Sequence, residues 1–239
     1  MVTMNDHGTR TGALLEPRPS RIELVVLDMA GTTVADDGLV ERAFGAALPD
    51  ATDEQLAYVR ATMGESKITV FRHLTGGDEE RAHAANAAFE AAYARLVDEG
   101  HCAPLPGAED ALRRLRDQGR GIALTTGFAR DTQDRILAAL GWNDLVDLAL
   151  CPSDVDGRGR PHPDMILTAA LRSRISSVAA VAVAGDTDSD MRAGRNAGAS
   201  VVAGVRTGAH DTATLRLAGA GHVLGSVAEL PDLLAAREG

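Results

Sequence analysis

Strand and helix patterns alternate from residue 104 onward, and this alternation limits the fold more than any other feature of the sequence. Short apolar runs typical of buried strands are separated by segments whose apolar residues recur three and four positions apart, as on one face of a helix. Alternating βα units predict an α/β fold with a parallel sheet covered by helices on both faces. The expected strands are residues 22–27, 121–126, 145–151, 178–186, 200–205 and 222–226, and the expected helices of this part are 108–119, 129–141, 162–174, 188–198 and 227–237.

Residues 37–103 follow a different pattern, because helical stretches succeed one another there without a strand. Thr52 and Asp78 are suitable N-cap residues for two of these helices. We therefore expect a helical module inserted between the first strand and the rest of the core, which comprises residues 21–36 and 104–239. The four helices of the module are expected at residues 39–48, 53–63, 66–74 and 78–100.

The composition is that of an ordinary globular chain and argues against several classes of protein. Of 239 residues, 45% are hydrophobic and 24% charged, and no apolar run approaches the ~20 residues of a membrane helix. Residues 1–20 lack periodicity and favour a flexible tail without the apolar stretch of a signal peptide. We therefore expect a cytoplasmic protein with no membrane contact, in which Cys102 and Cys151 are buried thiols.

Nucleic acid is a poor candidate for the partner of this chain. The formal net charge is −10, and aromatic residues make up only 3% of the chain. A nucleic-acid-binding protein would normally present a basic face or an aromatic stacking surface. These totals leave room for a small anionic substrate held by a local cluster of basic groups.

Polar side chains follow several of the expected strands, at the edge where parallel sheets bind ligands. Asp28 ends the first strand, Thr126 ends the second, and Asp186 and Asp190 follow the fourth. Carboxylates that converge repel one another unless a cation lies among them, and hard oxygen ligands select Mg²⁺. We therefore expect a Mg²⁺ site at this edge.

A hydroxyl and a guanidinium near these carboxylates would suit phosphoryl chemistry. Thr126 can donate a hydrogen bond to a phosphoryl oxygen, and Arg160, in the loop after the third strand, can neutralise the remaining charge. A carboxylate nucleophile would then form an aspartyl-phosphate intermediate. Asp154 and Asp156 lie in the same loop, and capping or loop-lining roles remain open for them.

Four motifs occur in order along the chain: DMAGT at 28–32, an apolar strand ending in Thr126, Arg160 within GRPHP, and GDTDSD at 185–190. Together they resemble the haloacid dehalogenase superfamily of phosphotransferases over nearly everything from Arg21 onward. One such motif is a weak signal, whereas four in order are a strong one. The resemblance implies a Rossmann-like parallel-sheet core with an inserted small α-helical cap domain at 37–103. It also implies that Asp28 is the nucleophile. The implied Mg²⁺ ligands are Asp28, Ala30, Asp186 and Asp190. The implied phosphate-binding residues are Ala30, Gly31, Thr126, Gly127 and Arg160.

One position within the first motif narrows the function. Most phosphatases of the superfamily carry a second Asp where this chain has Ala30, and that Asp protonates the leaving alcohol. Without this acid we expect an ordinary phosphate ester to be a poor substrate. The DxAGTT sequence is instead similar to that of phosphonoacetaldehyde hydrolase and its phosphonatase-like relatives, whose cap lysine forms a Schiff base with the substrate aldehyde. Met63, Gly64 and Lys67 match the Met-Gly-x-x-Lys element of these relatives, which implies contact of all three with the substrate.

Lys67 is the only lysine among 24 basic residues. A chemical need for an amine is one explanation, because guanidinium stays protonated and cannot serve as a nucleophile. Chance survival of one lysine is the other. Two roles are likewise open for Lys67. It could form an imine that accepts the electron pair of a breaking carbon–phosphorus bond, or it could act only as a cation that binds substrate charge. The imine requires a lowered pKa, which burial near Arg160 and Mg²⁺ would provide.

One mismatch with the phosphonatase-like pattern concerns proton transfer. The relatives carry a His three residues after the lysine, and this chain has Val70 there. His73 could substitute, although a packing or surface role is the simpler interpretation, and the same holds for His162. The substrate is therefore expected to be phosphonoacetaldehyde or a related phosphonate with a carbonyl next to the phosphonomethyl carbon. Trp142 is interpreted as a core or interface residue.

Three functions follow from these patterns. The first is a Mg²⁺-dependent hydrolase that cleaves the carbon–phosphorus bond of a small phosphonate, and the second is a phosphomonoesterase of the same fold in which Lys67 binds substrate. The third, a binding or regulatory protein, is disfavoured because the whole set of motif residues is intact. Relatives commonly pair through their caps, and the Ala-rich helices of residues 37–100 offer close-packing surfaces, so we expect a homodimer.

Overall fold

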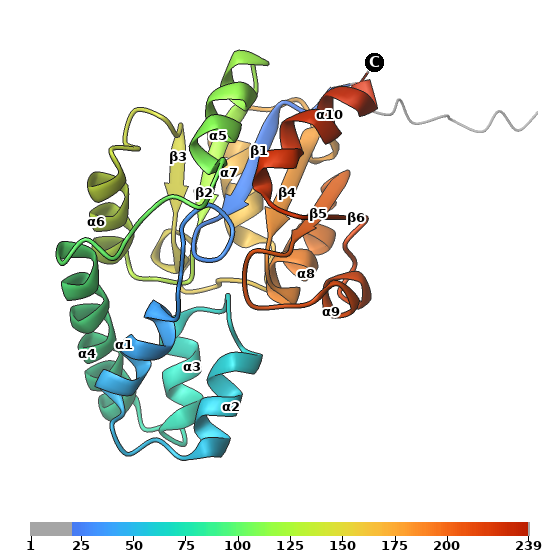
Figure 1. Cartoon of the computed structure of the whole chain (residues 1–239). Coiled ribbons are helices and arrows are strands. Elements are labelled where there is room, and N and C mark those ends of the chain that lie inside the picture. Colours follow the sequence, from blue (N-terminus) through green and yellow to red (C-terminus); the bar gives the residue numbers. More distant parts are fainter. Residues whose placement is uncertain (1–20, 239) are drawn as a thin grey trace, which may run out of the picture.

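A six-stranded parallel sheet, in the order β3-β2-β1-β4-β5-β6, is the centre of the structure (Figure 1), a computed structural model that describes residues 21–238. The strands consist largely of β-branched and aliphatic residues, because helices cover both faces of the sheet and exclude water from it. β1 lies between β2 and β4, so the direction in which the strand order runs changes there. The strands are β1 (Leu24–Asp28), β2 (Gly121–Thr125), β3 (Leu148–Leu150), β4 (Val181–Gly185), β5 (Val201–Val205) and β6 (His222–Leu224).

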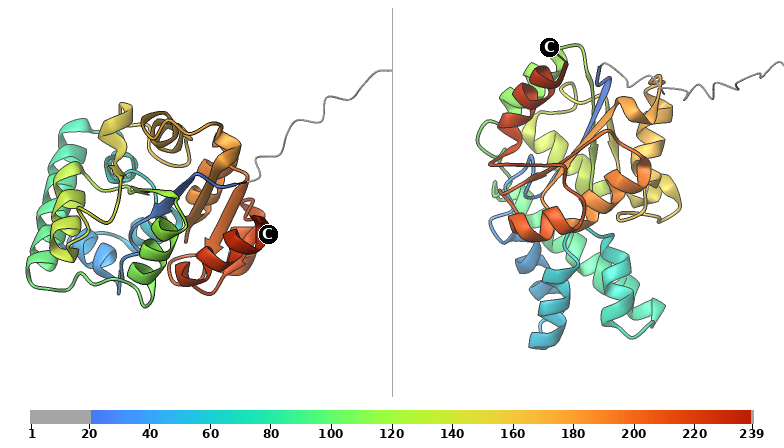
Figure 2. Two further views of the ribbon diagram at one scale, coloured as in Figure 1. Left: turned by 90° about the horizontal axis from the view of Figure 1, so that it is seen from above. Right: turned by 90° about the vertical axis from the view of Figure 1, so that its right-hand side faces the viewer.

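Helices pack on both faces of the sheet, as the two views of Figure 2 show. Val25 and Leu27 of β1 belong to the core cluster that includes α5 (Ala108–Asp117), α6 (Arg130–Leu140) and α10 (Leu230–Glu238). Leu24 and Val26 point to the opposite face, where they pack with α7 (Asp164–Arg172) and α8 (Asp188–Ala197). This alternation is the period of two that a strand imposes on its side chains.

Four helices inserted after β1 lie beside the carboxyl ends of the strands (Figure 1). Thr52 and Asp78 cap two of them as predicted: each side chain accepts a backbone N–H of the first helical turn. α1 packs along α4, the longest helix of the described residues. We call this unit the helical insert; it consists of α1 (Leu39–Ala47), α2 (Asp53–Ala61), α3 (Lys67–Leu74) and α4 (Glu79–Asp98).

The predicted fold class is confirmed, since the core is a Rossmann-like parallel sheet surrounded by helices. The boundaries at residues 37 and 103 and the separate standing of a cap domain stay predictions, and the predicted tail, residues 1–20, lies outside the described residues. Cys151 is buried and Cys102 half-buried, and both are free thiols. Within residues 21–238, no helix combines the length and the apolar character needed to cross a bilayer.

Some local predictions were wrong. The first three residues of the predicted strand 178–186 form a 3₁₀ turn, because the Ser177 hydroxyl accepts the Ala179 N–H before the strand begins. Residues 227–229 likewise form a 3₁₀ turn ahead of α10. A short helix, α9 (Thr212–Leu217), was not predicted.

Candidate active site

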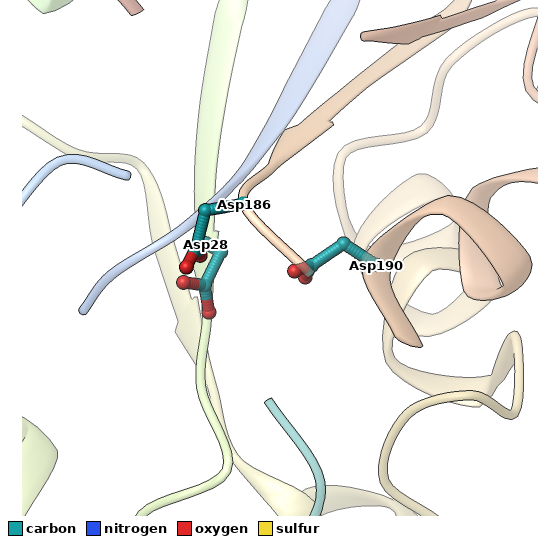
Figure 3. A group of neighbouring side chains, drawn as sticks. All are labelled: Asp28, Asp186 and Asp190. Carbon is teal, nitrogen blue, oxygen red and sulfur yellow. The ribbon is translucent and has the colours of Figure 1, made fainter. Parts of the chain in front are cut away.

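Three aspartates meet where the strand order changes direction. Asp28 is the last residue of β1, Asp186 directly follows β4, and Asp190 lies in the first turn of α8. Figure 3 shows the carboxylates of Asp28 and Asp186 close together, with that of Asp190 directed toward them from α8. One carboxylate oxygen from each residue lies within 4.8 Å of the others, and all three residues are buried. The predicted convergence of these carboxylates therefore occurs in the structure.

The position of Asp186 depends on its neighbours. Its Oδ1 accepts the Thr32 hydroxyl at 3.0 Å, and its Oδ2 accepts the Ala209 N–H at 2.7 Å. Glycines allow the backbone to approach so closely: an added Cβ would lie 2.6 Å from Asp186 Oδ2 at Gly31, which also has a φ of +82°, and 1.9 Å away at Gly208. Gly31 was predicted as a substrate-binding residue, and it also makes room for Asp186.

Asp190 is fixed by the helix that carries it. Its side chain accepts the Thr187 backbone N–H at 3.1 Å, while the Thr187 hydroxyl accepts the Asp190 N–H at 3.3 Å. This capping box begins α8. The GDTDSD motif therefore provides both a carboxylate of the cluster and the start of the helix that carries it.

Arg160 is the counter-ion of the aspartate cluster. Its buried guanidinium lies 2.5 Å from Asp28 Oδ1 and also pairs with Asp190. Burial raises the pKa of Asp28 well above its usual value, and the negative charge of Asp190 adds to this, whereas Arg160 opposes it. Burial also raises the pKa of Asp186, to about 6. Arg160 therefore offsets part of the repulsion among the three buried carboxylates.

The donor set of the cluster suits a small hard cation. All three side chains offer only oxygen, and hydrogen bonds from Thr32 and Ala209 leave further lone pairs of Asp186 free to coordinate. The predicted ligands Asp28, Asp186 and Asp190 therefore fit a divalent ion such as Mg²⁺. Ala30 lines the cavity next to them, and coordination by its carbonyl stays a prediction.

The segment that carries Lys67 rests on the loops of the core. The Lys67 backbone N–H, at the start of α3, donates to the Gly127 carbonyl at 3.1 Å. A Cβ at Gly127 would lie 2.2 Å from the Glu65 carbonyl oxygen, and one at Gly64 would lie 2.4 Å from Thr187 Oγ1. Glycine at these two positions therefore brings the helical insert into contact with the core.

The Lys67 amine lies in a largely apolar environment. The residue is only 5% exposed, and Nζ lies 5.9 Å from the ring centre of Phe44 and 5.5 Å from that of Phe128. All four phenylalanines of the chain pack together here with Tyr93. These rings and the burial of the residue keep most water from the amine.

Electrostatic neighbours of Lys67 act in both directions. Burial lowers the pKa of Lys67, and the nearby positive charge of Arg160 lowers it further. The negative charges of Asp36, Asp28 and Glu90 oppose this shift. The net effect is a lowered pKa, in agreement with what the imine hypothesis requires.

A cavity of about 480 Å³ joins most of the predicted site residues. Thr126 follows β2 at its floor, and its Oγ1 accepts the Phe128 N–H at 3.2 Å. Asp190 is the one predicted residue that does not line the cavity; it lies behind Arg160. The predicted residues that do are Asp28, Ala30, Gly31, Met63, Gly64, Lys67, Thr126, Gly127, Arg160 and Asp186.

Other residues weighed from the sequence lie outside this cavity. Val70 is buried in the core cluster, and His73 stacks on Tyr58 with ring centres 3.8 Å apart. Asp154 accepts the Cys151 N–H at 2.9 Å, which is a capping role. Trp142 is buried, as expected of a core residue. His162 is exposed beside Arg158.

Among the residues that line the cavity and were not predicted from the sequence, four are next to the predicted site residues. Thr187 lies within the GDTDSD motif, which could have indicated it. Ala209 lies in the loop after β5, at the edge of the sheet where ligands bind, and this position could have indicated it. Phe128 directly follows Gly127. Asp36, in the turn before α1, carried no recognisable signal, because only the folded chain brings it near Lys67.

Comparisons with known proteins agree with this geometry. A family model for haloacid dehalogenase-like hydrolases matches residues 22–198. A phosphonoacetaldehyde hydrolase-like protein from Syntrophobacter fumaroxidans is 31% identical over 76% of this chain and 72% of its own. A phosphonoacetaldehyde hydrolase from Bacillus cereus is 30% identical over 74% of each chain.

Two solved structures share the fold. A phosphonoacetaldehyde hydrolase-like protein from Oleispira antarctica superposes with a TM-score of 0.79 at 24% identity, covering 91% of this chain and 92% of its own. A predicted phosphoglycolate phosphatase from Haemophilus somnus superposes with a TM-score of 0.72 at 19% identity, covering 89% of this chain and 97% of its own. At these identities the two structures establish the fold alone.

Proposed function

Because this chain belongs to the haloacid dehalogenase-like hydrolases, we propose that it cleaves the carbon–phosphorus bond of a small phosphonate that carries a carbonyl group. Phosphonoacetaldehyde, after which its curated relatives are named, is the first candidate substrate. The observation that carries this proposal is that the only lysine of the chain is buried in the same cavity as Asp28, with a lowered pKa. A neutral amine in that place can form an imine with a carbonyl.

The reaction divides between the two sides of the cavity. On the side of the helical insert, Lys67 attacks the substrate carbonyl and forms an iminium ion. On the side of the core, the Asp28 carboxylate attacks phosphorus and forms an aspartyl-phosphate, while the electron pair of the carbon–phosphorus bond moves toward the iminium nitrogen. The enamine left on Lys67 takes up a proton from water at carbon and becomes an iminium ion again, and water then hydrolyses this iminium ion and the aspartyl-phosphate.

The remaining residues of the site bind the phosphonate group and neutralise its charge. Thr126 and the backbone of Ala30, Gly31 and Gly127 bind the phosphonate oxygens, and Arg160 neutralises their charge. Asp28, Asp186 and Asp190, with the Ala30 carbonyl, would hold Mg²⁺, which would further stabilise the charge on the transferring group. We take the helical insert with Met63 and Gly64 as the cap that closes over the substrate.

A second candidate function is a phosphomonoesterase in which Lys67 only binds substrate charge. The negative charges of Asp36, Asp28 and Glu90 near Lys67 favour this alternative, because they stabilise the protonated amine. Ala30 is an argument against it, since it offers no acid at the position where most phosphatases of the family protonate the leaving group.

Borohydride trapping with a Lys67→Arg variant separates the two functions. With phosphonoacetaldehyde and Mg²⁺, borohydride should inactivate the wild-type protein and add the mass of the reduced substrate fragment to the peptide containing residues 63–72. Lys67→Arg keeps the charge and removes the nucleophile, so it should abolish cleavage of the carbon–phosphorus bond and the adduct together.

The alternative predicts a different result for the same variant. If Lys67 only binds charge, Lys67→Arg should raise KM and retain much of kcat, and no adduct should form. A phosphate monoester without a carbonyl is the matched control substrate. Good turnover of this ester, together with no trapping by any phosphonate, would favour the phosphomonoesterase.

A further inference from the structure

Asp36 is a titratable side chain of the cavity that the steps above do not use. It lies in the turn between β1 and α1, is half-buried, and lines the cavity together with Lys67 and Asp28. Lys67 and Asp36 are close enough for each to shift the pKa of the other. This carboxyl is therefore placed on the amine side of the cavity.

The imine steps need a proton donor at that side. When the amine has added to the carbonyl, the oxygen of the resulting carbinolamine can leave only as water, and this requires a proton. The phosphatase acid of the first motif is replaced by Ala30, and the position of the expected histidine is taken by the buried Val70. No histidine is among the described residues that line the cavity.

The other carboxyl groups of the cavity have different partners. Asp28 and Asp186 belong to the aspartate cluster. Glu41 forms two hydrogen bonds with Arg60, at 2.9 and 3.0 Å, and Asp37 is exposed. Among the described carboxyl groups that line the cavity, Asp36 is therefore the one that is half-buried and belongs neither to the aspartate cluster nor to an ion pair with Arg60.

The local structure orients this carboxyl and favours its protonated form. Asp36 Oδ1 accepts the Val40 N–H at 3.0 Å, which ties the side chain to the first turn of α1. Burial raises the pKa of Asp36, the hydrogen bond from Val40 and the charge of Lys67 oppose this rise, and the charges of Asp37 and Glu41 add to it. A carboxyl with a raised pKa is better matched to proton donation near neutral pH than an ordinary aspartate.

We infer that Asp36 is the general acid of the imine steps, a role that rests on the proposed function. The Asp36 carboxylic acid donates its proton to the carbinolamine oxygen, the bond from carbon to oxygen breaks, and the nitrogen lone pair forms the carbon–nitrogen double bond. The products are one water molecule, the Lys67 iminium ion and the Asp36 carboxylate. On hydrolysis, water adds to the iminium carbon and Asp36 takes back the proton that this addition releases.

Capping of α1 is the structural role that the same residue could have without any catalytic one. An asparagine would still accept the Val40 N–H but could not donate the proton, so Asp36→Asn separates the two roles. Asp36→Glu keeps an acid within reach and tests rescue. Asp37→Asn is the matched control, because it removes a carboxylate one residue away that is exposed.

The test measures how fast the iminium forms. Wild type and the three variants are mixed with phosphonoacetaldehyde and Mg²⁺, borohydride is added after increasing times, and the adduct on the peptide containing residues 63–72 is quantified by mass spectrometry. Thermal melting of each variant checks its folding. Asp36→Asn should slow adduct formation by about 10²-fold, the lower end of what general acid catalysis contributes, while Asp37→Asn proceeds at the wild-type rate and Asp36→Glu recovers part of it.

Each contrary result has a defined meaning. An Asp36→Asn variant that forms the adduct at the wild-type rate overturns the role of Asp36 and leaves the proposed function standing. A glutamate variant as slow as the asparagine variant also overturns it, because an acid would then be present without effect. Absence of any adduct in the wild-type protein overturns the proposed function and this inference with it.

Discussion

Lys67 is the residue whose chemistry depends most on its surroundings, and its amine can be titrated directly. Because burial and Arg160 lower its pKa, the neutral and reactive amine should persist at a pH where an ordinary lysine, with a pKa of about 10.4, is protonated. Reductive methylation with formaldehyde and cyanoborohydride over a pH series, read by mass spectrometry of the peptide containing residues 63–72, should give a midpoint below that of N-acetyl-lysine.

The unfolded chain provides the control for this titration. In concentrated urea the same residue is solvated, and the midpoint should return to that of N-acetyl-lysine. Equal midpoints for folded and unfolded protein would contradict the lowered pKa, and would weaken the imine hypothesis because the amine would be protonated at neutral pH.

Single residues of the candidate site were predictable to different degrees. Asp28 and Asp186 were found because strand periodicity marks where a strand ends, and Lys67 because it is unique in the composition. Asp36 was missed for a physical reason: its significance depends on its distance to Lys67, which only the packing of the helical insert on the core determines. No local pattern encodes such a distance.

Among the helices, α8 links stability to the aspartate cluster, and Thr187 is the residue through which this link can be tested. The Thr187 hydroxyl caps the helix and also donates to Asp190 Oδ2 at 2.5 Å. Thr187→Ala should therefore lower the free energy of unfolding by about 1 kcal/mol, measured by urea denaturation. It should also raise the Mg²⁺ concentration that restores half of the activity after EDTA treatment, because Asp190 loses its support.

Serine at the same position is the matched comparison. Thr187→Ser keeps the hydroxyl and should retain both the stability and the Mg²⁺ requirement of the wild type. If the alanine variant matched the wild type in both measurements, the capping box would have no role in holding Asp190. Full activity after thorough EDTA treatment would contradict the metal site itself.

Helices and strands were predictable where the apolar pattern was long enough. α4 extends over 20 residues, and both its period and its Asp78 cap were evident from the sequence. α9 has six residues, fewer than two turns, so periodicity could not distinguish it from a loop. The 3₁₀ turn at Val178–Ala180 continues an apolar run into β4, and the hydrogen bonds of Ala179 and Ala180 to Ser177 separate the two.

Considered as a whole, the molecule brings residues of the parallel core and of the helical insert to one cavity. The parallel core provides the aspartates (Figure 3), Thr126 and Arg160, and the helical insert provides Lys67. The order of the motifs predicted the core side of the site. The insert side was predicted only through a short element at residues 63–67, because contacts between core and insert through Gly64 and Gly127 depend on tertiary packing.

The assembly of whole chains is the last prediction, and the outer surface of α4 suggests where it would occur. Ala84, Ala87, Ala88 and Ala91 are all exposed there, and their spacing of three and four residues places them on one face of the helix. Small side chains let two helices approach closely, so pairing of this face with its copy would give a twofold-symmetric dimer. Light scattering at micromolar concentration should then yield twice the 24.9 kDa of the chain.

Ala88→Arg should reduce the mass to that of one chain, because a long charged side chain prevents close approach, whereas Leu217→Arg, at an exposed position on α9, should leave the dimer intact. A wild-type mass of 24.9 kDa would contradict the dimer, and dissociation by Leu217→Arg alone would place the interface on α9.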